Sequence, residues 1–73
     1  MTTIKNLGAN KTELWKDNGV VFFSYETPVA AKIEGKLYRT SKKYSVTTSK
    51  HINAWLEHRH ADEKPQEFFD SLV

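Results

Sequence analysis

"VVFFSYETPVAAKIEGKLYRT", residues 20–40, contains the segments that decide the fold. Val20 to Tyr25 form a run of β-branched and aromatic residues, which favours a β-strand. The apolar residues of this run are consecutive rather than alternating, so we expect both of its faces to be covered. A helix on one face and a partner chain on the other would meet that requirement.

Turn signals divide the surrounding chain into short strands. Asn18 and Gly19 precede the run, and an Asn-Gly pair supplies the two positive φ angles of a type I′ hairpin turn. Pro28 cannot donate to a ladder and marks a bend, a strand start or a sheet edge. "EGK" at residues 34–36 predicts a second turn. We therefore expect an antiparallel meander of three to four strands between about residues 12 and 40, with strands at 12–15, 20–25, 27–33 and 37–40.

The apolar period changes after residue 45. Ile52, Trp55 and Leu56 are spaced i, i+3 and i+4, with Arg59 at i+7, which predicts an amphipathic helix over about residues 48–60. Its candidate N-caps are Thr47, Thr48 and Ser49. A short second helix is expected over about residues 65–72, with Pro65 at its first position and an apolar side of Phe68, Phe69 and Leu72. The expected class is a small α+β protein.

Length and composition narrow the range of architectures. The 73 residues suit one domain, 1–73, with a thin core, and the absence of cysteine excludes disulfides and thiolate metal sites. No segment approaches the roughly 20 apolar residues of a membrane span, and residues 1–11 do not resemble a signal peptide. We expect a cytoplasmic protein without membrane contact.

Charge is unevenly distributed, although the net charge is only +2. Residues 31–60 carry seven Lys or Arg against Glu34 and Glu57, whereas residues 61–73 carry four acidic residues against one lysine. Such asymmetry points to an anionic partner. The alternative is that the acidic tail folds back and neutralises the basic middle.

The basic segment from Lys36 to His51 contains no acidic residue and leads into the expected main helix. A helix N-terminus binds anions through its unpaired amides and the positive end of its dipole. The candidate nucleic-acid-binding residues in this segment are Lys36, Tyr38, Arg39, Lys42, Lys43, Tyr44, Thr47, Thr48, Ser49, Lys50 and His51. The alternative is ordinary helix capping together with solubilising lysines.

Exposed aromatic side chains on a basic sheet would stack single-stranded bases. Tyr38 and Tyr44 are the expected exposed pair, because Phe22 and Trp55, with either Trp15 or Phe23, are needed in the core. That the two tyrosines merely pack is equally compatible with the sequence.

Catalytic and metal-binding patterns are weak. His51 and His58 are seven residues apart, a spacing that does not let them share a metal ion, and no carboxylate has the spacing of a zincin helix. No Gly-rich phosphate loop accompanies the basic segment. We expect a protein that is not an enzyme and needs no cofactor.

Four motifs recur in a known group of proteins. They are FSYxTPVA at Phe23–Ala30, GxxYRT at Gly35–Thr40, KxSxTTS at Lys43–Ser49 and HINxWL at His51–Leu56. Over residues 23–56 the chain resembles a family of small uncharacterised proteins encoded by phages, plasmids and prophages. The resemblance implies an origin in a mobile element and a place in the host cytoplasm, where such proteins commonly bind nucleic acid or block a host enzyme.

Two functions follow from these observations. In the first, the protein is a homodimer that binds nucleic acid, either single strands or the phosphate backbone. In the second, it is an anti-CRISPR-like inhibitor that binds a host defence or nucleic-acid enzyme through its acidic tail, Asp62, Glu63, Glu67 and Asp70. The basic middle favours the first function.

Overall fold

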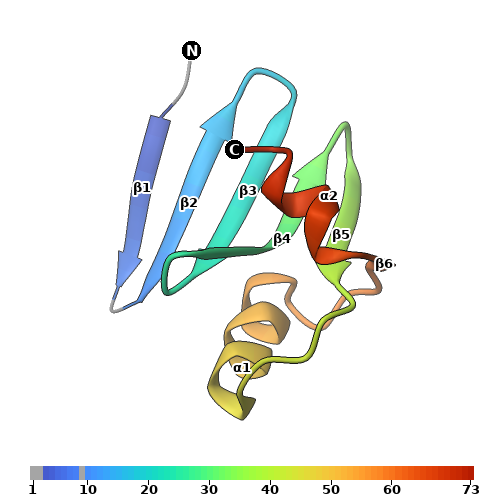
Figure 1. Cartoon of the computed structure of the whole chain (residues 1–73). Helices are drawn as coiled ribbons and strands as arrows, with labels where there is room; N and C mark the ends of the chain where they lie inside the picture. The colour runs from blue at the N-terminus through green and yellow to red at the C-terminus, as the bar shows by residue number, and fades with distance from the viewer. Residues whose placement is uncertain (1–2, 9) are drawn as a thin grey trace.

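The computed structural model describes residues 3–8 and 10–73. Within them the chain forms one six-stranded sheet and two helices (Figure 1). The elements are β1 (Thr3–Gly8), β2 (Lys11–Lys16), β3 (Gly19–Ser24), β4 (Thr27–Ile33), β5 (Lys36–Thr40), α1 (Val46–Trp55), β6 (Asp62–Lys64) and α2 (Gln66–Asp70).

The sheet is mixed, and its strands lie in sequence order. β1 to β5 form an antiparallel meander, whereas β6 returns after α1 and pairs in parallel with β5. The α+β class is therefore confirmed, but the expected meander of three to four strands is too small. The sequence signals missed β1, which has a weak apolar pattern, and β6, which consists of three charged residues.

Glycine has different roles in the β2–β3 and β4–β5 turns. The β2–β3 loop is Asp17 and Asn18, and neither Asn18 nor Gly19 has a positive φ, so the expected type I′ pair is wrong. Gly19 is instead required by close approach, because a Cβ there would lie 2.2 Å from the carbonyl oxygen of Lys32. The consecutive positive φ angles occur in the β4–β5 turn, at Glu34 (50°) and Gly35 (83°).

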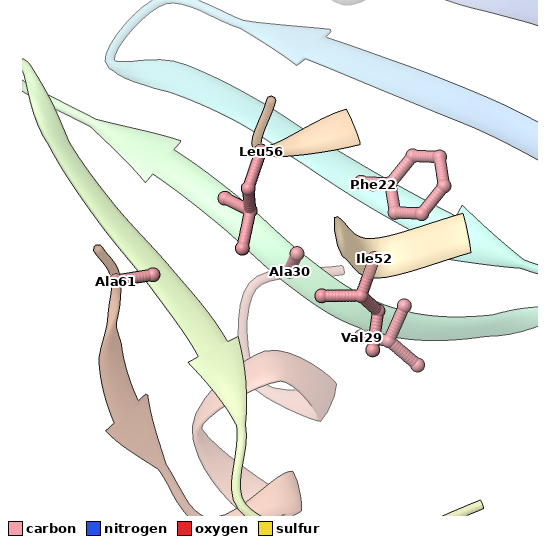
Figure 2. Close-up of a cluster of buried hydrophobic side chains, with 6 residues drawn as sticks. All are labelled: Phe22, Val29, Ala30, Ile52, Leu56 and Ala61. Carbon is pink, nitrogen blue, oxygen red and sulfur yellow. The ribbon is translucent and has the colours of Figure 1, made fainter. Parts of the chain in front are cut away.

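The two helices cover opposite faces of the sheet (Figures 1 and 2). Phe22 of β3 stacks on Trp55 of α1, with ring centroids 5.1 Å apart. Val21, its neighbour in the strand, points to the other face, where α2 packs against β4. Both faces of Val20–Phe22 are thus covered, and α2 covers part of the face that a partner chain was expected to fill, whereas Tyr25 at the end of the run is 48% exposed.

A cluster of buried apolar side chains lies between α1 and the sheet (Figure 2). Its members are Phe22, Val29, Ala30, Ile52, Leu56 and Ala61. Val29 and Ala30 belong to this same cluster although they are consecutive, and the β3–β4 register shifts beside them, between Phe22 and Phe23. Ile52 and Leu56 belong to the predicted apolar stripe of the helix.

Helix α1 begins and ends earlier than the sequence predicts. Its N-cap is Ser45, whose hydroxyl accepts a hydrogen bond from the Thr48 amide at 3.2 Å, so none of the three expected residues is the N-cap. The helix ends at Trp55 rather than near residue 60, because Glu57 and His58 have positive φ angles. The short C-terminal helix spans only residues 66–70, with Pro65 as its N-cap instead of its first residue.

Candidate functional site

A hollow of about 260 Å³ lies where β5, the following loop and the first turns of α1 meet. Six of the predicted binding residues line it, namely Arg39, Lys42, Lys43, Tyr44, Thr48 and Ser49. Thr40, Ser41, Ile52 and Glu63 complete its wall. We call this feature the basic hollow.

Two hydrogen bonds of the buried Thr40 hold the loop of the basic hollow in place. Thr40 accepts a hydrogen bond from the Lys42 amide at 3.2 Å and donates one to Gln66 Oε1 at 3.0 Å. Gln66 Nε2 in turn donates to the carbonyl of Pro28 at 2.7 Å. The backbone that carries the two exposed lysines is thereby joined to α2 and to β4.

Positive charge predominates in the basic hollow. Lys42 and Lys43 are exposed, and across the described ranges 3–8 and 10–73 no carboxylate forms an ion pair with either. The Lys42 ammonium lies 5.3 Å from the centroid of the Tyr44 ring. Arg39 donates to Asn53 Oδ1 at 3.1 Å, and Glu63 is its neighbour across the β5–β6 pair. Three cations therefore line the wall beside one carboxylate.

The acidic tail does fold back, with β6 along β5 and α2 against β4. The parallel pairing places Asp62 beside Tyr38 and Glu63 beside Arg39. The strand pairing therefore neutralises the basic middle only at β5, because Lys42 and Lys43 lie beyond the strand. Neutralisation of the basic middle is therefore partial.

The other predicted site residues lie outside the basic hollow. Lys36 begins β5, at the opposite end of the strand from the loop, and Thr47 and Lys50 are exposed on α1. His51 is half-buried, and its Nδ1 lies 2.9 Å from the hydroxyl of the buried Ser24. Its ring centroid is 6.1 Å from that of Tyr25.

The expectation that Tyr38 and Tyr44 form an exposed pair is wrong. Tyr38 is half-buried and packs on Phe68 of α2, with centroids 5.3 Å apart. Tyr44 packs against the core and donates from its hydroxyl to Gln66 Oε1 at 2.8 Å. Burial raises the pKa of Tyr44, and the Asp70 carboxylate raises it further.

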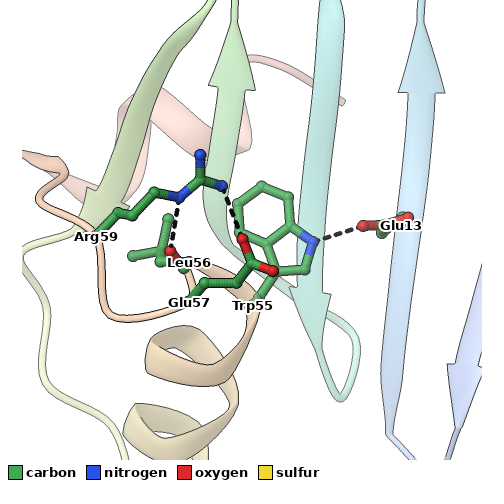
Figure 3. A network of polar contacts seen from close by, with 5 residues as sticks. All are labelled: Glu13, Trp55, Leu56, Glu57 and Arg59. Carbon is green, nitrogen blue, oxygen red and sulfur yellow. Dashed lines mark hydrogen bonds and ion pairs between the residues drawn. The ribbon is translucent and has the colours of Figure 1, made fainter.

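Sequence reasoning missed a cluster of two tryptophans and one carboxylate. Glu13 Oε1 accepts the indole N–H of Trp15 at 3.0 Å. Its Oε2 accepts that of Trp55 at 2.6 Å (Figure 3). The contact between Glu13 and Trp15 joins residues only two positions apart on β2, so the sequence could have suggested it. The contact between Glu13 and Trp55 joins residues 42 positions apart, and only the tertiary structure reveals it.

The described part of the chain shows neither a metal site nor a membrane-spanning helix. Residues 3–8 and 10–73 contain no group of three or more His, Cys, Asp or Glu side chains arranged to hold a metal ion. In that same part of the chain, neither helix has the length and apolar character needed to cross a membrane.

Comparison with known proteins gives one match. The model of a protein family described as "Family of unknown function (DUF8033)" matches residues 2–71. No curated protein and no solved structure matches the chain significantly. The expected relationship to an uncharacterised family is confirmed, while the phage origin stays a prediction.

Proposed function

Since the chain belongs to the family of unknown function DUF8033, which names no activity, we propose from its geometry that it binds nucleic acid through the phosphate backbone. We infer further that it favours single strands and catalyses no reaction. The observation that carries the proposal is the basic hollow, where Arg39, Lys42 and Lys43 meet the N-terminus of α1.

The helix terminus adds a directional contribution to the attraction of phosphate. The first amides of a helix lack intrahelical acceptors, and Ser45 satisfies only the Thr48 amide. The amides of Val46 and Thr47, directly before the two α1 residues that line the basic hollow, lie at the positive end of the helix dipole. Lysines supply charge and amides supply direction, which suits a phosphodiester group.

A nucleic-acid strand fits the charge pattern better than a mononucleotide does. No Gly-rich phosphate loop accompanies the basic hollow. The exposed Lys50, which follows Ser49 of the hollow on α1, adds a further positive charge, as a ligand with several phosphates requires. This charge pattern supports a role on nucleic acid, and we propose that the protein comes from a mobile element and acts in the host cytoplasm.

We also propose that the protein acts as a homodimer. An apolar hollow on the sheet face that carries α2 is lined by Ile4, Leu14, Phe23 and Tyr25, and Ile4 is 71% exposed. A second copy would cover this surface beside the edge strand β1.

Titration of a labelled single-stranded 20-mer at several salt concentrations tests the nucleic-acid proposal. Replacing Lys42 and Lys43 by alanine removes two phosphate contacts, so the slope of log affinity against log salt should flatten by about 1.4, at roughly 0.7 per contact. Lys11→Ala removes one positive charge from β2, outside the basic hollow, and should leave the slope unchanged. Absence of binding by the parent protein at low salt, to both DNA and RNA, would overturn the proposal.

The second candidate function is inhibition of a host defence or nucleic-acid enzyme. The supporting observation is that Asp62, Glu63, Glu67 and Asp70 are all exposed, on β6 and α2. Such a surface would imitate nucleic acid toward a basic protein site. If Glu63→Gln with Glu67→Gln abolishes activity in cells, while the Lys42 and Lys43 variant acts like the parent, the inhibitor function replaces the first.

A further inference from the structure

A second hollow of about 260 Å³ lies on the sheet face that carries α1, beside the C-terminal end of that helix. Trp15 of β2 and Trp55 of α1 line it, together with the apolar side chains of Val20 and Leu37. Lys32 and Arg59 contribute the positive charges of its rim. We call this feature the tryptophan hollow.

The polar edges of both indoles are already occupied. Both N–H groups donate to the single carboxylate of Glu13, which fixes the two rings. Figure 3 shows the bond from Trp55. Trp55 is further held by its stack on Phe22, whereas Trp15 is 40% exposed. What Trp15 offers to a ligand is therefore the face of its ring rather than a hydrogen-bond donor.

Unpaired positive charge surrounds this ring. The Lys5 ammonium lies 4.5 Å from the centroid of Trp15. Of the two acidic residues in the tryptophan hollow, Glu57 pairs with Arg59 at 3.6 Å and Glu13 accepts the two indoles. Lys32 is exposed and forms no ion pair with a carboxylate of the described ranges. A ligand with a flat ring and an adjoining negative charge fits the face of Trp15 and the ammonium groups of Lys5 and Lys32.

The tryptophan hollow is connected to the basic hollow by shared residues. Arg59 also lines an intermediate hollow, which includes Arg39, and Arg39 in turn lines the basic hollow. Arg39 and Arg59 therefore lie between the two lysines and Trp15, in an intermediate hollow that also contains the carboxylates of Asp62 and Glu63.

We propose that Trp15 is a stacking platform for one base of a single-stranded nucleic acid, and this inference rests on the proposed function. The base would displace the Lys5 ammonium from the ring face, and Lys5 and Lys32 would then meet the adjoining phosphates. Stacking needs an unpaired base with a free face, so the platform selects single strands over a duplex and tolerates any base. In this proposal Trp15 stacks on a base, the role that the sequence predicted for Tyr38 and Tyr44.

The test compares a thymidine 20-mer with an abasic 20-mer that has the same number of phosphates. The parent should bind the thymidine strand about tenfold more tightly, the low end of the range for base stacking. Trp15→Ala should remove this preference and leave both the salt slope and the affinity for the abasic strand unchanged. Trp15→Phe keeps an aromatic face and should retain most of the preference. Thermal melts of the variants control for folding.

The outcomes separate the inference from the proposed function. Suppose Trp15→Ala keeps the parent's preference, while the Lys42 and Lys43 variant flattens the salt slope. The platform is then wrong and the proposed function stands. An equal loss of affinity for both strands would mean that Trp15 acts structurally, which also overturns the platform. If neither strand binds to the parent, the proposed function and the inference fail together.

Discussion

Gly19→Ala tests whether close approach or backbone conformation requires the glycine at the start of β3. A Cβ at this position would lie 2.2 Å from the Lys32 carbonyl oxygen and 3.0 Å from the Ile33 Cα, whereas ordinary van der Waals contact begins near 3.4 Å. Both neighbours belong to the backbone of β4, so the end of the β3–β4 pair must open. Overpacking costs about 1–3 kcal/mol, and a lost ladder hydrogen bond adds about 1 kcal/mol. We expect the free energy of unfolding to fall by about 2–4 kcal/mol, a large part of the total for so small a domain.

Urea unfolding monitored by circular dichroism measures this loss, and two control variants interpret it. Gly35→Ala has open space around its Cβ but a φ of +83°, so it should cost only the strain of that conformation, about 1–2 kcal/mol. Asn18→Ala should change stability by less than about 0.5 kcal/mol, because Asn18 has no positive φ to maintain. The reasoning is refuted if Gly19→Ala unfolds like the parent, or if Asn18→Ala is as damaging as Gly19→Ala.

Three further predictions concern the core, the pH dependence and the assembly. Trp55→Ala removes the stack on Phe22 and the hydrogen bond to Glu13, and should lower the free energy of unfolding by about 3 kcal/mol in the same urea assay. The pKa of Tyr44 is raised in the folded state, so its contribution to stability is complete below about pH 10 and is lost as the pH rises through the folded-state pKa. Thermal melts between pH 9 and 11 should accordingly show a shallower alkaline decline for Tyr44→Phe than for the parent, and equal declines would contradict the shift. Light scattering at about 100 μM should give a particle larger than the 8.4 kDa monomer, and Ile4→Lys should reduce it to that mass, whereas a monomeric parent would exclude the homodimer.

Much of the fold follows from local signals in the sequence. The β-branched and aromatic residues of Val20–Tyr25 and the turn at Glu34–Gly35 predict strands in hairpin order, since both effects act between neighbouring residues. The spacing of Ile52 and Leu56 likewise predicts the buried face of α1. The concentration of Arg39, Lys42 and Lys43 next to a helix N-terminus was also readable, because strand, loop and helix are consecutive.

Other features depend on contacts between distant segments, and only the tertiary structure decided them. Residues 62–64 have no strand propensity, and they form β6 because the edge of β5 offers unpaired backbone groups. Alternation along a strand tells which residues share a face, but it does not tell which face a helix will cover. The packing of α2 buries part of Tyr38, whereas the arrangement of α1 and β2 leaves Trp15 exposed beside Trp55 and Glu13. The sequence by itself therefore determined the strands β2 to β5, the approximate positions of the two helices and the basic segment. The packing of the two helices on the sheet determined which aromatic rings a ligand can reach.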